Sequence, residues 1–222
     1  MTSLPHVLQA RSGTSFFSAS SATSCPDAGR VRCAVLIAAA VLLLSSALRA
    51  QESVVTLVPT STKVAFTLGA TMHTVHGTFK LKSGEMRFDP STGKASGAVV
   101  LDATTAETGN SSRDSKMHKE ILESAKFPEI VFTPTQVKGT IAPQGMSEVD
   151  VTGVIRLHGQ DHDFTLMISV ESAANGELHA STKFAVPYIK WGLKNPSNFF
   201  LHVSDTVDVE VRATARLTSA HQ

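Results

Sequence analysis

Two pairs of histidines in the sequence have a spacing that could serve metal chemistry. His73 and His76 are three residues apart, and His158 and His162 are four apart. Both pairs lie in segments with strand or hairpin patterns, and residues three apart on a strand point to opposite faces. His158 and His162 flank a tight turn and could face one another across it, but no third ligand is identifiable. We therefore expect no bound metal, and keep a His-dependent metal enzyme as an alternative.

Other groupings that carry catalysis are missing from the sequence. It contains no G-x-S-x-G motif, no H-E-x-x-H motif and no glycine-rich phosphate loop after a strand. The carboxylate pairs Asp161/Asp163 and Asp205/Asp208 fall at turns or on the charged side of a strand, where solvation explains them. The sequence therefore predicts a protein that is not an enzyme and that uses no cofactor.

The composition excludes several further classes of protein. The chain has 222 residues, 20 Lys and Arg, 19 Asp and Glu, two cysteines and 42% apolar residues. It is too hydrophobic for a disordered protein and too poor in cysteine for a disulfide scaffold. Its charges are also too evenly balanced for a nucleic-acid-binding protein, so we expect no nucleic-acid partner.

The first 50 residues have the pattern of a leader. An apolar run at 34–44 follows Arg30 and Arg32 and precedes small residues, which is the order found in a secretory signal peptide. A membrane-spanning helix needs about 20 apolar residues, more than this run supplies. We expect cleavage near Ala50, with Ala47 as the second choice. The prediction is a leader at 1–50, a single domain at 51–222, and a periplasmic or secreted location.

Removal of this leader changes the chemistry of the chain. Four arginines, one aspartate and both cysteines lie within the first 50 residues, so the remaining chain has 16 basic and 18 acidic residues and no thiol. Such a domain folds without a disulfide. We also expect it to contain no membrane-spanning segment after processing.

The remaining chain follows a two-residue alternation that is typical of β-strands. In 205–217, apolar residues at every odd position from Val207 to Leu217 alternate with Asp208, Glu210, Arg212, Thr214 and Arg216. Similar alternation recurs at 64–68, 79–81, 149–157, 164–170 and 178–184. A strand of this kind has one dry face and one wet face, as in antiparallel sheets.

Short turns separate these strands and predict up-and-down neighbours. Glycine-bearing polar segments occur at 82–84, 89–93, 143–145, 159–161 and 174–176. About eight amphipathic antiparallel strands are best satisfied by a barrel, because closure removes the exposed edges. A two-sheet sandwich is the alternative fold.

Two segments depart from the strand pattern. At about 111–122, Asn110 or Ser111 can cap a short helix, and Asp114 follows Ser111 at the spacing of a capping box. The segment 186–200 contains two prolines, the single Tyr188 and the single Trp191, so we expect a loop near one end of the barrel.

The inward positions mix phenylalanines with small residues. A small barrel is either filled by its own side chains or holds one ligand, and this mixture is compatible with both. The sequence pattern alone therefore leaves open a hollow barrel and a solid one.

Four sequence elements occur in order between about Val58 and Leu217. They are KVAF at 63–66 with HGTF at 76–79 and GEMRFD at 84–89, TGNSSRD at 108–114, FPEIVFT at 127–133, and VTGVIRLHG at 151–159. In this order and spacing they resemble the YceI-like family of exported polyisoprenoid-binding proteins.

This resemblance implies a fold, a ligand and a site. The fold is all-β, an extended antiparallel lipocalin-like β-barrel of about eight strands with the short helix at about 111–122. The ligand is a long isoprenoid chain, as a polyprenyl phosphate or an isoprenoid quinone, held in the barrel by a non-enzymatic carrier or stress-related binder. We predict that Phe66, Leu68, Phe79, Leu81, Phe88, Phe132 and Phe184 line the channel. The predicted head-group contacts are His76, Arg113, Asp114 and Trp191, with a structural role favoured for Arg113 and Asp114.

Two further possibilities accompany this interpretation. One is a solid-barrel envelope protein that recruits a protein partner through the loop at 188–200. The other is a homodimer, with which the sequence is compatible.

Overall fold

The computed structural model describes residues 52–71, 73–197 and 202–219. The predicted leader and its cleavage site near Ala50 lie outside the described residues. No helix in the described part of the chain is long and apolar enough to cross a membrane.

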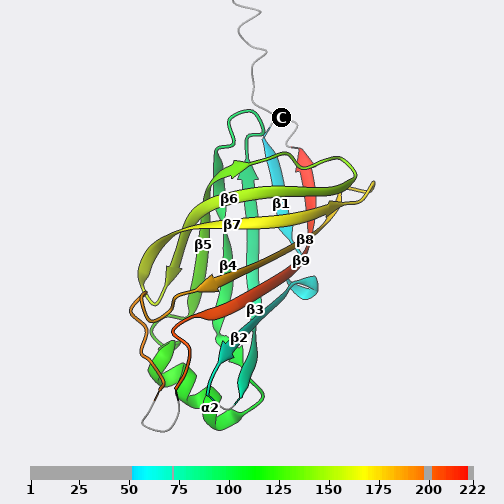
Figure 1. Ribbon diagram of the computed structural model, residues 1–222. Coiled ribbons are helices and arrows are strands. Elements are labelled where there is room, and N and C mark those ends of the chain that lie inside the picture. The colour runs from blue at the N-terminus through cyan, green and yellow to red at the C-terminus, as the bar shows by residue number, and fades with distance from the viewer. Residues whose placement is uncertain (1–51, 72, 198–201, 220–222) are drawn as a thin grey trace, which may run out of the picture. The chain divides into compact units, whose positions relative to one another are not determined.

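The described residues form one closed antiparallel sheet of nine strands, in the order β1-β3-β2-β9-β8-β7-β6-β5-β4 (Figure 1). The strands are β1 (Ser53–Leu57), β2 (Lys63–Gly69), β3 (Thr74–Phe88), β4 (Ala95–Glu107), β5 (Glu129–Lys138), β6 (Gly145–Leu157), β7 (Gln160–Ser172), β8 (Glu177–Val186) and β9 (Val207–Ser219). Pairing between β3 and β4 closes the sheet. The all-β prediction of a barrel is confirmed, and the sandwich alternative is wrong.

Strands β1 and β2 share one position in the wall, so nine strands build an eight-stranded barrel. Both lie between β3 and β9, β1 beside their C-terminal halves and β2 beside their N-terminal halves. A 3-10 turn, η1 (Pro59–Ser61), separates them.

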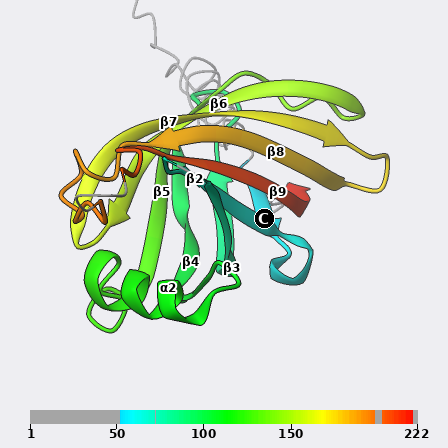
Figure 2. The same ribbon diagram turned by 60° about the horizontal axis from the view of Figure 1, so that its bottom comes forward.

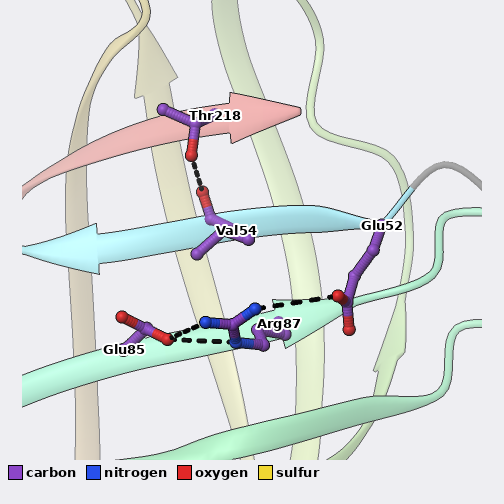
Figure 3. Close-up of polar contacts among 5 residues, drawn as sticks. All are labelled: Glu52, Val54, Glu85, Arg87 and Thr218. Atoms are coloured by element: carbon purple, nitrogen blue, oxygen red, sulfur yellow. Dashed lines mark hydrogen bonds and ion pairs between the residues drawn. The ribbon is translucent and has the colours of Figure 1, made fainter. Parts of the chain in front are cut away.

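Exposed polar contacts surround the short β1 strand on the outer face of the barrel (Figure 3). Arg87 of β3 pairs with Glu85 at 2.7 Å and lies 3.9 Å from Glu52, which precedes β1. On the other side, the Thr218 hydroxyl donates to the carbonyl oxygen of Val54 at 3.5 Å. These contacts are exposed, so the pairing of β1 depends mainly on its backbone ladder and on buried Val55.

One predicted turn is wrong. Residues 82–84 lie inside the continuous strand β3, where the register with β4 shifts between Leu81 and Ser83. Gly84 serves close packing there, because a Cβ at this position would lie 2.3 Å from a methyl carbon of Leu57. The polar and glycine residues of this segment mark a bulge and not a turn.

The predicted helix is present but changes type along its length. It consists of α2 (Ser111–Lys116) followed by a π-helical turn, η2 (Met117–Ile121). Asn110 is the N-cap, and its side-chain oxygen accepts a hydrogen bond from the backbone N–H of Arg113 at 3.0 Å. The expected capping box is absent, since Asp114 instead accepts a hydrogen bond from the backbone N–H of Thr108 at 2.9 Å. Figure 2 shows that the helix lies across one end of the barrel.

Two clusters of buried apolar residues occupy opposite ends of the interior. We call the first the far end; it contains Val55, Phe88, Val137, Val149, Val151, Val170, Leu178 and Ala215. The second, here called the helix end, contains Ile155, Leu157, Val186, Tyr188, Trp191 and Leu193, with Ile121 and Leu122 packed against it. Phe132 of β5 packs against both clusters.

Candidate ligand-binding site

The interior of the barrel is hollow. A cavity of about 720 Å³ extends through it and is lined by residues of all nine strands, of the helix and of the loop after β8. Its volume falls in the range of ligand-binding pockets, roughly 300–1,000 Å³. A barrel with this interior is not the solid barrel of the envelope-protein alternative.

The structure places every predicted channel residue on the wall of this cavity. The seven share an inward position on β2, β3, β5 or β8: Phe66, Leu68, Phe79, Leu81, Phe88, Phe132 and Phe184. Their contact with a ligand stays a prediction.

Glycines on neighbouring strands leave space for two of these rings. Gly77 pairs with Phe66 across β2 and β3, and a Cβ on Gly77 would lie 2.2 Å from the Phe66 ring. A Cβ on Gly153 would lie 2.9 Å from the Phe132 ring. Each ring therefore covers a glycine of the wall, which keeps the lumen open. This pairing of glycine with phenylalanine depends on the strand register, which no local sequence pattern reveals.

Polar residues on the cavity wall gather at the helix end. Three polar lining residues belong to the strand region: Thr62, Ser181 and Thr182. The others lie at or beside the helix: His73, Thr108, Asn110, Ser112, Arg113 and Lys116. Along the described part of the wall no Asp or Glu contributes to the lining, so both of its permanently charged groups are cations.

Arg113 is held at this end in a fixed orientation. Its Nε donates to the Thr108 hydroxyl at 2.7 Å, and one terminal nitrogen donates to the Thr108 carbonyl oxygen at 3.0 Å. Asp114 bonds to the same hydroxyl and does not line the cavity. The structure thus places Arg113 on the wall and Asp114 behind it, in a supporting position.

The two remaining predicted head-group residues lie in different places. His76 is exposed on the outer face of the barrel, where its Nδ1 lies 3.2 Å from the Thr67 hydroxyl. It is not on the cavity wall, whereas His73 is, so the geometry does not support a ligand contact by His76. Trp191 does line the cavity, and its ring stacks on His162 with centroids 4.2 Å apart.

Comparison with known proteins agrees with this architecture. Residues 55–215 match the model of the YceI-like domain. The chain belongs to the YceI-like family. Among curated relatives, the UPF0312 protein of Pseudomonas savastanoi pv. phaseolicola is 37% identical over 105 residues, which cover 46% of this chain and 50% of that protein. Protein YceI of Salmonella arizonae is 35% identical over 96 residues, 41% of this chain and 47% of that protein, so the match spans about half of each relative's length.

Solved structures share the fold of this YceI-like barrel at low sequence identity. A polyisoprenoid binding domain from Saccharophagus degradans, implicated in plant cell wall breakdown, has a TM-score of 0.57 at 16% identity, covering 74% of this chain and 98% of that one. BcnA of Burkholderia cenocepacia has a TM-score of 0.57 at 12% identity, covering 71% and 98%. At these identities the likeness establishes the fold alone.

The histidine pairs of this YceI-like domain do not form a metal site. The His158 ring packs on Phe127 at 4.4 Å, and its Nε2 lies 3.3 Å from a carboxylate oxygen of Glu123. His162 lies in a different environment, stacked on Trp191. Within the described ranges, no group of three His, Cys, Asp or Glu residues is arranged to hold a metal ion. The geometry therefore offers nothing to the metal-enzyme alternative.

Tyr188 closes the helix end from the loop after β8. It is 5% exposed, and its hydroxyl donates to the carbonyl oxygen of Ser204 at 2.8 Å. Burial, with a smaller contribution from the charge of Asp205, raises the pKa of Tyr188 to about 12. The phenol therefore stays neutral and anchors the loop at physiological pH.

Proposed function

We propose that this protein is a non-enzymatic carrier that holds a long isoprenoid chain inside its barrel. The observation that carries the proposal is a hollow apolar interior whose charged lining residues are confined to one end. An amphiphile with a long apolar tail and a polar head matches that distribution. The S. degradans relative is described as a polyisoprenoid binding domain, which supports the same ligand class here.

The free energy of such binding comes from the tail. Burial of apolar groups contributes about 0.8 kcal/mol per CH₂, so ten buried carbons supply several kcal/mol without any specific polar contact. Because a chain of this kind is insoluble in water, a protein that moves it between compartments has to enclose it. No catalytic group is needed for this task.

The head group belongs at the helix end, and the residues there favour an anion. Arg113 and Lys116 line the cavity, and the Arg113 guanidinium is already oriented by Thr108. Guanidinium groups bind phosphate through strong, charge-assisted hydrogen bonds. A polyprenyl phosphate therefore suits this mouth better than an isoprenoid quinone, whose head is neutral.

A location outside the cytoplasm completes the proposal. The signal-peptide pattern in the first 50 residues predicts export to the periplasm or beyond. An aqueous compartment next to a membrane is where an isoprenoid lipid needs a soluble carrier. Detection of the processed protein in a periplasmic or culture-medium fraction tests this part separately.

The experiment that tests the function is lipid analysis of the purified protein. Mass spectrometry of an organic extract should detect a co-purifying isoprenoid lipid. Added polyprenol, polyprenyl phosphate and isoprenoid quinone should each change the fluorescence of Trp191, the single tryptophan of the chain, which lines the cavity. Repeated absence of lipid from the extract, together with no response to any added compound, would overturn the proposal.

A further inference from the structure

We infer that Phe88 sets the length of isoprenoid tail that the barrel encloses, and that the enclosed length is about six isoprene units. This inference rests on the function proposed above. It follows from three observations: the direction in which the cavity is closed, its volume, and the position of Phe88 within it.

The cavity has one mouth for an amphiphile and one dry end. Among the described residues of its wall, both permanent cations lie at the helix end, in α2. The lining residues of the far-end cluster are all apolar, including Phe88 and Leu178. Because a buried charge without a partner is costly and a hydrocarbon terminus has no charge, the tail enters first and its last carbons reach the far end.

Hydrogen-bonded turns cover this far end. The turn after β3 is fastened across to β5, since the backbone N–H of Val137 donates to the carbonyl oxygen of Gly93 at 2.7 Å. The loop between β5 and β6 contributes Ile141, which lines the cavity and packs against the far-end cluster. The backbone N–H of Ala142 is in turn held by the Ser147 hydroxyl at 2.9 Å. A tail cannot lengthen past this cover without disrupting it.

The volume sets the capacity. A dry apolar cavity of about 150 Å³ takes up one benzene, which is roughly 25 Å³ per carbon. At that density, a cavity of about 720 Å³ holds close to 30 carbons, or about six five-carbon isoprene units. Further units of a longer chain would remain outside the mouth, in water.

Phe88 is the aromatic ring at the stopping point. It is the last residue of β3, it is 8% exposed, and it belongs to the far-end cluster. Replacement by alanine removes six ring carbons, slightly more than the five carbons of one isoprene unit. Met167 of β7 is 66% exposed and does not line the cavity, so Met167→Ala provides a control truncation that leaves the cavity unchanged.

The test is a competition between chain lengths. The protein is incubated with an equimolar mixture of all-trans polyprenols of three to ten units in detergent micelles, the detergent is removed, and native mass spectrometry identifies the retained lengths. An isoprene unit is buried from water equally well in the micelle and in the cavity. When a chain longer than the cavity leaves the micelle, its outermost isoprene units become exposed to water. The amount of retained polyprenol should therefore fall for chains longer than about six units.

Three variants make the assignment falsifiable. Phe88→Ala should move the limit up by about one unit, Met167→Ala should not move it, and Ala180→Phe, which adds a ring to the cavity wall beside the far-end cluster, should move it down by about one unit. Circular dichroism identifies any variant that fails to fold, and the chain-length limits of the two other variants can still be compared. Retention without a length limit, or the same limit in all folded variants, overturns the inference; no retention of any polyprenol instead contradicts the proposed function.

Discussion

At the far end of the barrel the cluster that lines the cavity is apolar, whereas at the helix end the lining includes Arg113 and Lys116. The far end is built by strands and tight turns. The helix end is built by a short α-helix, a π-helical turn and the loop after β8. The apolar far end is thus formed by regularly paired strands, whereas the helix end, with its charged lining residues, is formed by irregular backbone.

Backbone strain follows the same division. Two residues other than glycine have positive φ in the described chain, Glu123 at 45° and His158 at 52°, and both lie at the helix end. Glu123 follows η2, and His158 begins the two-residue turn between β6 and β7. Neither residue lines the cavity, so this strain shapes the turns around the helix end and not the cavity wall itself. We therefore expect the regularly paired far end to contribute more to stability than the irregular helix end.

The largest expected difference between the ends is in the response to a core truncation. Leu178→Ala at the far end should lower the free energy of unfolding by about 3 kcal/mol, and Leu193→Ala at the helix end by about 2 kcal/mol. Leu178 is held between paired β7 and β9, so the space it leaves cannot collapse, whereas Leu193 lies in a loop that can adjust. Urea denaturation followed by circular dichroism measures both values.

These two leucines are a matched pair because both line the cavity and are nearly equally buried, at 3% and 6% exposed. An equal loss of unfolding free energy in the two variants would show that the two ends are equally rigid. It would also contradict the expectation that the far end contributes more to stability.

The far end is also the part that the sequence predicted best. Alternation in 205–217 predicted β9, and the turn at 89–93 was expected where the structure has it. Such patterns are readable because each strand buries every second residue against one core. The error at 82–84 arose because a β-bulge uses the same small and polar residues as a turn.

The helix end was less predictable, because its geometry depends on contacts distant in sequence. One error there was local: His76 was expected near the head group, although its alternation with cavity-lining Val75 places it outside, beside Thr67. Its neighbour His73, which precedes β3, reaches the cavity wall. The stacking of His162 on Trp191 joins β7 to a loop almost thirty residues later, and no local pattern signals it.

The second prediction tests the charge at the helix end. Arg113→Gln should weaken the binding of a polyprenyl phosphate about tenfold or more, because a hydrogen bond to a charged group contributes about 1.5–3 kcal/mol. The binding of the uncharged polyprenol should change by less than about threefold, since the tail supplies most of its free energy. Trp191 fluorescence titration measures both affinities.

A matched substitution separates charge from local structure at this mouth. Lys116→Gln removes the other cation of the wall from an exposed side chain, so its effect on phosphate binding should be in the same direction but smaller. If Arg113→Gln instead lowers the affinities for polyprenol and polyprenyl phosphate by the same factor, Arg113 only supports the backbone at Thr108.

The third prediction concerns alkaline pH and again the helix end. Because burial raises the pKa of Tyr188 from 10.0 to about 12, the unfolded chain loses this proton before the folded chain does. Its contribution to stability is therefore present below pH 10 and is lost as the pH rises toward 12. Tyr188→Phe should show a shallower fall of unfolding free energy across this range. Ultraviolet absorbance can follow the phenol directly, since the chain has one tyrosine; a midpoint near 10 in the folded protein would contradict the prediction.

The smallest effect is expected at acidic pH and at the far end. Asp89 begins the turn after Phe88, and its carboxylate accepts hydrogen bonds from the Ser91 N–H and hydroxyl at 2.8 and 2.7 Å and from the Thr92 hydroxyl at 2.8 Å. The Ser91 bonds, followed by that of Thr92, lower the pKa of Asp89 from 3.8 to about 2.

A lowered pKa means that the folded state binds the proton less readily than the unfolded state. The contribution of Asp89 is therefore present above pH 3.8 and is lost as the pH falls toward 2. Asp89→Asn should reduce the acid dependence of the melting temperature only slightly, because the carboxylate is close to solvent and the amide oxygen can keep part of the turn. Thermal unfolding of both proteins between about pH 5 and 2 measures this difference. A larger acid effect here than the alkaline effect of Tyr188→Phe would show that the cover of the far end, and not the loop at the helix end, is the part of the barrel most sensitive to titration.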